Sequence, residues 1–423
     1  MPIRSFVLAM RQRVPLLALL LAGAVGAVGA AALAAPEAAK ADWPQYRGPQ
    51  RSGVSQETGL LKSWPAAGPK MLWRVPLGDG YSGISVADGR AFTMYATGKE
   101  EFAAAFDVAT GKEVWKLRID AVREDDMGAG PRSTPTVDGD VVFVVSESGM
   151  VFALKAGNGE KIWSKDLKVE FGAPVPQWGI STSPLVEGDL LLLDAGGGKN
   201  KSLAALDKKT GATRWTAHSD RPGYSSPLAV TIQEVRQVLS FAGSSLVSVA
   251  AADGKVLWSV PWKTSYDVNA AMPVLIPPDR VFISSGYDTG GAVYRIKKEG
   301  EAFKTEEVWN TRVMKNHFNS SVHYGGYLYG FDDATLKCVD AGTGEEKWRQ
   351  RGFQKGSLLV ADGHLVILSE AGLLLLADAV PEGFKEQGRM QVLEGRTWTM
   401  PSLAGGKLYL RNQKEMVALE LAG

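Results

Sequence analysis

Tryptophan recurs along this chain at a nearly regular spacing. Seven tryptophans follow one another at intervals of 39 to 52 residues, at Trp73, Trp115, Trp163, Trp215, Trp258, Trp309 and Trp348. Several of them end the phrase Ala-x-Asp-x-x-Thr-Gly-x-x-x-Trp, which is clearest before Trp115, Trp215 and Trp348. A period of this length is typical of repeat architectures, in which one small structural unit is copied along the chain. The recurring residues therefore build the scaffold, and function is expected where the copies differ.

A second signal gives the number of units. Eight pairs of turn-forming residues separate apolar stretches, and such pairs predict two-residue hairpin turns. They are Asp88-Gly89, Asp138-Gly139, Glu187-Gly188, Gln233-Glu234, Pro278-Asp279, Gly325-Gly326, Asp362-Gly363 and Gly405-Gly406. Each unit reads as four strands, the fourth of which carries the tryptophan. We therefore predict an all-β protein with a single eight-bladed β-propeller of four-stranded blades over residues 70–423.

The two ends of the repeat region complement each other. The last unit stops after a third strand that ends at Leu421, whereas Trp73 precedes the first complete unit. We predict that the strand around Trp73 completes the last blade and closes the ring, which removes the exposed sheet edges. The recurring tryptophans are expected to dock each blade on its neighbour, because each indole can bury a large apolar area.

The chain begins with the features of an export signal. Arginines precede an apolar run over residues 14–34, and small residues suit cleavage after residue 34 or as late as residue 41. We expect residues 1–34 to be a cleaved signal peptide and residues 35–69 to be a lead-in that packs on the propeller. The alternative is an uncleaved anchor, because about 20 apolar residues can span a bilayer.

The only cysteine, Cys338, lies far from the predicted cleavage region. No thiol is therefore available there for lipid attachment. We expect a periplasmic or secreted protein that is not a lipoprotein and has no stable membrane span after cleavage.

Charge and residue spacing argue against several classes of function. The chain has 47 basic and 46 acidic residues, and no basic stripe runs among its aromatics, which argues against a nucleic-acid partner. The four histidines lack the spacing of a metal site. Asp267 is the acid nearest the predicted channel, and one acid is too few for Ca²⁺. The acidic run at residues 124–126 is interpreted as a solvated loop. No catalytic or metal-ligating residue is predicted.

The tryptophan phrase resembles the docking motif of the PQQ-like, or quinoprotein-type, β-propellers. That family includes quinoprotein alcohol dehydrogenases, which hold pyrroloquinoline quinone (PQQ) and Ca²⁺ in the channel. It also includes BamB, the non-enzymatic propeller lipoprotein of outer-membrane β-barrel assembly. The dehydrogenases carry a pair of adjacent cysteines that this chain lacks. The resemblance implies an exported, non-catalytic binding or scaffolding module of the cell envelope without a cofactor. The alternative is a PQQ-dependent dehydrogenase-like enzyme, or a PQQ-binding protein, that holds PQQ with Ca²⁺.

Large, unlike residues precede the inner strands that line a propeller channel. Polar groups that converge over an aromatic-lined hollow are typical of a ligand site, while Trp, Tyr and Arg also anchor protein interfaces. A third interpretation is that these side chains only fill the funnel. We predict that a monomer binds an envelope protein, a peptide or a small ligand at this ring. The predicted residues are Arg132, Trp178, Tyr224, Asn269, His317, Asn319, Lys355 and Trp398.

Overall fold

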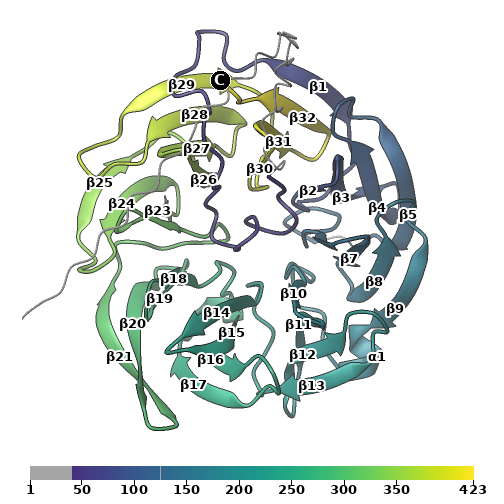
Figure 1. Ribbon diagram of the computed structural model, residues 1–423, viewed down its shortest axis with the longest axis vertical. Coiled ribbons are helices and arrows are strands. Elements are labelled where there is room, and N and C mark those ends of the chain that lie inside the picture. Colours follow the sequence, from purple (N-terminus) through teal and green to yellow (C-terminus); the bar gives the residue numbers. More distant parts are fainter. Residues whose placement is uncertain (1–40, 124) are drawn as a thin grey trace, which may run out of the picture. The chain divides into compact units, whose positions relative to one another are not determined.

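A ring of eight four-stranded antiparallel sheets forms the body of the protein (Figure 1). The computed structural model describes residues 41–123 and 125–423, so the predicted signal peptide, its cleavage after residue 34 and Glu124 lie outside the described residues. The predicted all-β, eight-bladed propeller is confirmed. The described helices are α1 (Leu167–Phe171) and a 3-10 turn over Ser265–Asp267. Neither of them has the length or hydropathy needed to cross a membrane.

Blades 1 to 4 follow one another along the chain. Blade 1 contains β2 (Ser85–Ala87), β3 (Arg90–Thr97), β4 (Glu100–Asp107) and β5 (Glu113–Ala121). Blade 2 contains β6 (Thr136–Asp138), β7 (Val141–Val145), β8 (Met150–Lys155) and β9 (Lys161–Asp166). Blade 3 contains β10 (Leu185–Glu187), β11 (Leu190–Gly197), β12 (Lys201–Asp207) and β13 (Thr213–Ala217). Blade 4 contains β14 (Leu228–Ile232), β15 (Val235–Phe241), β16 (Ser245–Ala250) and β17 (Val256–Pro261).

Blades 5 to 8 continue the ring. Blade 5 contains β18 (Val274–Ile276), β19 (Arg280–Ser285), β20 (Gly290–Glu299) and β21 (Ala302–Thr311). Blade 6 contains β22 (Val322–Tyr324), β23 (Tyr327–Asp332), β24 (Thr335–Asp340) and β25 (Glu346–Gln350). Blade 7 contains β26 (Ser357–Ala361), β27 (His364–Leu368), β28 (Leu373–Asp378) and β29 (Glu386–Gln391). Blade 8 contains β30 (Ser402–Ala404), β31 (Lys407–Arg411), β32 (Glu415–Glu420) and β1 (Met71–Pro76).

Ring closure occurs as predicted. Strand β1 pairs antiparallel with β32, with Trp73 opposite Ala418. The first strand of the ring thus serves as the outer strand of the last blade.

The hairpin turns lie close to their predicted positions. In blades 2 and 3 the two turn residues begin one position later than predicted, at Gly139 and Gly188, because Asp138 and Glu187 still pair in the sheet. In blade 5 the turn has three residues, since Ile276 pairs with Arg280. The other five predicted turns are confirmed.

Each recurring tryptophan packs on the blade that follows it. In five blades the indole lies against the glycine of the next Thr-Gly or equivalent turn; these glycines are Gly111, Gly159, Gly211, Gly254 and Gly344. Their φ values are between 70° and 76°, and an added Cβ would lie 2.5 to 2.9 Å from an indole atom. Such a turn needs glycine for its conformation and for its close contact. The phrase therefore encodes a contact between two blades.

Hydrogen bonds fix the orientation of most of these indoles. The Nε1–H groups of five tryptophans donate to a main-chain carbonyl oxygen of the following blade at 2.8 to 3.2 Å; they belong to Trp73, Trp115, Trp163, Trp309 and Trp348. Trp258 instead donates to Gln237 Oε1 in its own blade, at 2.9 Å. Its neighbour, blade 5, has a long hairpin between β20 and β21 in place of the glycine turn.

An eighth tryptophan covers the blade that lacks one. Blade 7 has no tryptophan on its outer strand β29. Trp64, from the segment before β1, is buried there, and its backbone N–H donates to Gln387 O at 3.0 Å. An added Cβ on Gly388 would lie 2.6 Å from Trp64 Cβ. The lead-in thus covers the outer strand of blade 7.

The same lead-in crosses the centre of the ring, where Figure 1 shows it in purple. Trp43 bridges to Val86 in blade 1, and Val54 bridges to Val360 in blade 7. Between these points the guanidinium groups of Arg47 and Arg51 are fully buried. They donate to carbonyls of residues that directly precede the inner strands of blades 3, 4 and 6, which are Ser183, Pro184, Pro227, Ser320 and Ser321. The lead-in therefore fastens several inner strands to one another.

The docking contact can be tested at one glycine with a matched control. Gly159→Ala should reduce the free energy of unfolding more than Gly139→Ala, by about 1–3 kcal/mol, because only the first Cβ meets an indole. Gly139 has a φ of 57°, and a Cβ added there would meet no atom within 4 Å. The Gly139→Ala variant therefore measures the cost of backbone strain alone. Urea denaturation followed by tryptophan fluorescence measures both. Equal losses would contradict the docking role.

A second substitution tests the lead-in. Arg51→Leu should lower the free energy of unfolding by at least about 2 kcal/mol, because it leaves buried carbonyls without a donor. Burial lowers the pKa of Arg51 to about 9, so the side chain stays charged at neutral pH. Arg118→Leu is the control, since its ion pair with Glu100 is exposed and contributes little. Equal urea midpoints for the two variants would contradict this role.

Candidate functional site at the channel mouth

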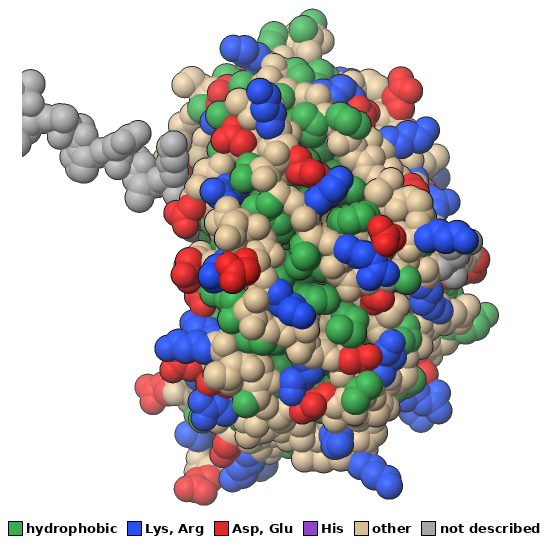
Figure 2. All heavy atoms as spheres, turned by 90° about the vertical axis from the view of Figure 1, so that its right-hand side faces the viewer, with side chains coloured by type: hydrophobic (Ala, Val, Ile, Leu, Met, Phe, Trp, Pro, Cys, Tyr) green, Lys and Arg blue, Asp and Glu red, His purple; other side chains and the backbone are tan. Residues whose placement is uncertain are grey.

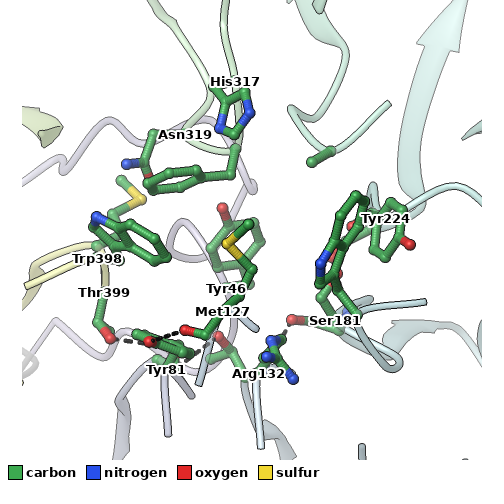
Figure 3. A pocket seen from close by; sticks show the side chains of 18 of the residues that line it. Tyr46, Tyr81, Met127, Arg132, Ser181, Tyr224, His317, Asn319, Trp398 and Thr399 are labelled. Carbon is green, nitrogen blue, oxygen red and sulfur yellow. Dashed lines mark hydrogen bonds between the residues drawn. The ribbon is translucent and has the colours of Figure 1, made fainter. Parts of the chain in front are cut away.

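A cavity of about 230 Å³ opens at the mouth of the channel. Figure 3 shows Trp398 on one side, Tyr224 on the other and Tyr46 of the lead-in between them. Seven of the eight residues predicted from the sequence line this cavity: Arg132, Trp178, Tyr224, His317, Asn319, Lys355 and Trp398. They come from six blades, so only closure of the ring brings them together. Their role in binding remains a prediction.

Asn269 is the exception, and its predicted place on the rim is wrong. The side chain is fully buried. Its Nδ2 donates to Ala242 O at 2.7 Å, and its Oδ1 accepts a hydrogen bond from Ser285 Oγ at 2.7 Å. The neighbouring Val268 and Ala270 take its place in the cavity lining. Asn269 therefore satisfies main-chain groups of blade 4.

Aromatic rings form a continuous row around the mouth. Neighbouring ring centroids are 4.9 to 6.4 Å apart, in the range typical of aromatic pairs. The order is Tyr224, Trp178, Tyr266, Tyr287, His317, Phe318, Trp398 and Tyr81. Sequence reasoning did not include Tyr81, Tyr266, Tyr287, Phe318 or Tyr46 in the site.

Two of these tyrosines sit on strained turns. Tyr266 and Asp267 have φ values of 62° and 56°, and Tyr287 and Asp288 have values of 52° and 60°. Residues other than glycine rarely adopt this conformation, which costs on the order of 1–3 kcal/mol each and is common at functional sites. The repeated Tyr-Asp pair is the sequence signal that could have identified them.

The acids of these turns face outward. Asp267 pairs with Arg221 at 2.8 Å, and Asp288 pairs with Arg312 at 2.9 Å. Tyr266 remains 71% exposed at the rim. The turns thus hold tyrosines at the mouth and keep their carboxylates out of it.

The charge of Arg132 is compensated by acids behind the cavity wall. Its guanidinium donates to both carboxylate oxygens of Asp125, at 2.9 and 3.0 Å, and to Glu147 Oε1. Burial raises the pKa of Glu147 to about 7, and the adjacent Arg132 opposes that shift. The Asp125 side chain is only 7% exposed, and Asp126 accepts a hydrogen bond from Trp178 Nε1 at 2.8 Å. The interpretation of this acidic run as a solvated loop is therefore wrong for Asp125, whose carboxylate pairs with Arg132, whereas Asp126 is exposed as expected.

Lys355 has a different environment. Its Nζ lies 3.4 Å from His317 Nδ1, and within the described chain it forms no ion pair with Asp or Glu. Glu370 accepts from the backbone N–H of Lys355, at 3.1 Å. Burial, and then the charge of Lys355, lowers the pKa of His317 to about 4. The imidazole is thus neutral at pH 7, and the contact with Lys355 leaves Nε2 to carry the hydrogen.

The lining does not suit Ca²⁺. No Asp or Glu of the described chain lines the cavity, whereas Ca²⁺ in proteins is held by six to eight oxygens, usually including carboxylates. Residues 41–123 and 125–423 also contain no cluster of three His, Cys, Asp or Glu side chains placed to hold a metal ion. The residues present therefore do not fit the PQQ–Ca²⁺ pair.

His317 should make stability depend on pH. Its folded pKa of about 4 lies below the ordinary value of 6.5, so the unfolded chain takes up this proton first as the pH falls. The stability contribution is complete above about pH 6.5 and is lost as the pH falls toward 4. In His317→Gln, the decrease in unfolding free energy between pH 7 and pH 4 should be smaller by about 1–3 kcal/mol. Identical pH profiles in urea denaturation would contradict this assignment.

The sequence is similar to proteins described as BamB. The family model described as "Outer membrane protein assembly factor BamB" matches residues 99–350. The BamB of Shewanella oneidensis is 23% identical over 376 residues, which covers 83% of this chain and 88% of that protein. The BamB of Burkholderia pseudomallei is 26% identical over 213 residues, which covers 48% of this chain and 49% of that protein.

Comparisons of structure show the fold alone. BamB from Moraxella catarrhalis superimposes with a TM-score of 0.61 at 14% identity, covering 84% of this chain and 98% of that one. A quinohemoprotein alcohol dehydrogenase from Pseudomonas putida gives a TM-score of 0.62 at 12% identity, covering 90% and 80%. A BamB and an alcohol dehydrogenase thus match equally well, so the fold does not distinguish between them.

Proposed function

The chain belongs to the BamB family of outer membrane protein assembly factors, and on that premise we propose that it is a non-catalytic binding or scaffolding module of the cell envelope. We place it in the periplasm, where its partner is another envelope protein. The proposed docking site is the channel mouth. The observation that carries this proposal is the continuous aromatic row around a cavity that no acid of residues 41–123 and 125–423 lines.

Aromatic side chains at a concave centre are the usual anchors of protein interfaces. Here the rings lie close enough to hold one another in place, as in the contact of Phe318 with Trp398, whose centroids are 4.9 Å apart. Tyr46 closes the floor of the cavity, and the lead-in crosses the channel behind it. A segment that protrudes from a partner can therefore enter the mouth and be stopped by this floor.

The alternative is a PQQ-dependent enzyme. It is supported by the likeness of fold to the quinohemoprotein dehydrogenase. Among the described residues no carboxylate lines the cavity for Ca²⁺, and the chain has a single cysteine in place of an adjacent pair. We therefore assign no step of catalysis to this site.

Retention of envelope proteins tests the proposed function. Immobilised protein should retain a defined set of solubilised envelope proteins, and Trp178→Ala with Trp398→Ala should weaken that retention at least about 30-fold, because each indole is a candidate anchor worth about 2 kcal/mol or more. The control is Val114→Ala with Ile162→Ala, two exposed apolar residues on β5 and β9. Figure 2 shows that side of the ring, where basic and acidic side chains are interspersed. Equal retention by both double variants would contradict the assignment to the mouth.

A titration with PQQ tests the alternative. Under the proposed function, PQQ with Ca²⁺ should leave the melting temperature unchanged. A ligand that binds the folded state raises this temperature in a saturable way. A saturable rise that requires Ca²⁺ and disappears in the Trp178→Ala, Trp398→Ala variant would instead support cofactor binding.

A further inference from the structure

We propose that the channel mouth recognises a partner polypeptide by an aromatic side chain next to a carboxylate. The ring would enter the cavity, and the carboxylate would pair with Lys355. This inference rests on the proposed function and specifies the chemistry of the partner.

The sign of the partner's charge follows from how the cations of the mouth are paired. The cavity lining contains two cations and, within the described chain, no acid. Arg132 is ion-paired with Asp125 and Glu147, which Arg123 also approaches at 3.6 and 3.9 Å. The Lys355 ammonium contacts the neutral imidazole of His317 and forms no ion pair with an Asp or Glu of the described residues. A carboxylate brought into a half-buried site beside this ammonium forms a charge-assisted hydrogen bond.

A third cation lies between Trp398 and Tyr81 at the mouth. Arg396 lies over the Trp398 ring, 4.4 Å from its centroid, and its Nη1 donates to Tyr81 OH at 3.2 Å and to Met127 O at 2.9 Å. Within the described chain it forms no ion pair. Arg396 is therefore a second cation of the mouth without an acidic partner among the described residues.

The apolar part of the ligand follows from the walls of the cavity. Phe318 and Trp398 form one wall, and Tyr46 forms the floor. The cavity of about 230 Å³ exceeds the roughly 150 Å³ of an apolar cavity that admits benzene. One aromatic side chain can therefore enter and stack against these rings, which adds to the free energy of burial.

A bound polypeptide would cover more of this aromatic surface than a bound small anion would. The aromatic row continues from Tyr287, which lines the cavity, to Tyr266 on the rim; these tyrosines are 36% and 71% exposed. A ligand confined to the cavity would contact Tyr287 but leave Tyr266 in water, although both tyrosines sit on strained turns. A chain that crosses the rim covers them and presents main-chain carbonyls to the Nε2–H of His317.

The experiment uses the exported chain and three blocked peptides. The probes are acetyl-Gly-Phe-Asp-Gly-amide, its Asn counterpart and its Ala-Asp counterpart, titrated against tryptophan fluorescence. The Asp peptide should bind about tenfold more tightly than the Asn peptide, the difference expected for one hydrogen-bonded charge pair. The Ala-Asp peptide should bind most weakly. Raising NaCl from about 50 mM to about 500 mM should reduce the preference for Asp.

Two variants locate the interaction. Lys355→Gln should abolish the preference for Asp over Asn, and Lys355→Arg should retain it. Tyr266→Ala should weaken binding of the Asp peptide but leave binding of 3-phenylpropionate unchanged, because only the peptide reaches the rim. Tyr266 is exposed, so this variant keeps the test available even if Lys355→Gln fails to fold.

Three results would overturn the inference. They are equal binding of the Asp and Asn peptides, a preference for Asp that survives in Lys355→Gln, and binding of 3-phenylpropionate as tight as that of the peptide. Retention of envelope proteins without any peptide preference would refute this chemistry and leave the proposed function intact. A peptide preference that depends on Lys355, without any retained envelope protein, would refute the scaffold role and leave the chemistry of the site intact.

Discussion

The contact between an indole and the glycine turn of the next blade is the interaction on which this propeller depends. A four-stranded blade cannot bury both of its faces alone, so its position must be fixed by its neighbours. The indole buries apolar area and donates a hydrogen bond across the gap, while the glycine allows the close approach. Repeated around the ring, this contact sets the spacing of the inner strands and therefore the width of the channel.

The lead-in closes the channel below the mouth, so that the mouth is a cavity with a floor. Arg47 and Arg51 are buried without acidic partners in the described chain, and main-chain carbonyls of the inner strands satisfy their donors. Tyr46, next to them, forms the floor of the cavity. One short segment thus links the blades and gives the mouth its depth.

Charge is distributed unevenly around this mouth. On one side an arginine is held by two carboxylates, and on the other a lysine faces a neutral histidine. Because the scaffold contacts are the same in most blades, these differences arise only from residues outside the repeated phrase. The site is therefore a property of the loops, carried on a regular frame.

The eight blades, the closure by Trp73 and most of the residues at the channel mouth can be predicted from the order of the amino acids, because periodic packing leaves a periodic pattern of residues. Seven of eight predicted rim residues line the cavity, since they occupy equivalent positions before the inner strands. The direction of each side chain cannot be predicted in this way and is known from the folded chain. In the folded chain Asn269 points inward, Asp125 is buried against Arg132 and Tyr266 lies at the rim. These outcomes depend on contacts between residues from different blades and loops, and such contacts leave no local period for sequence reasoning to detect.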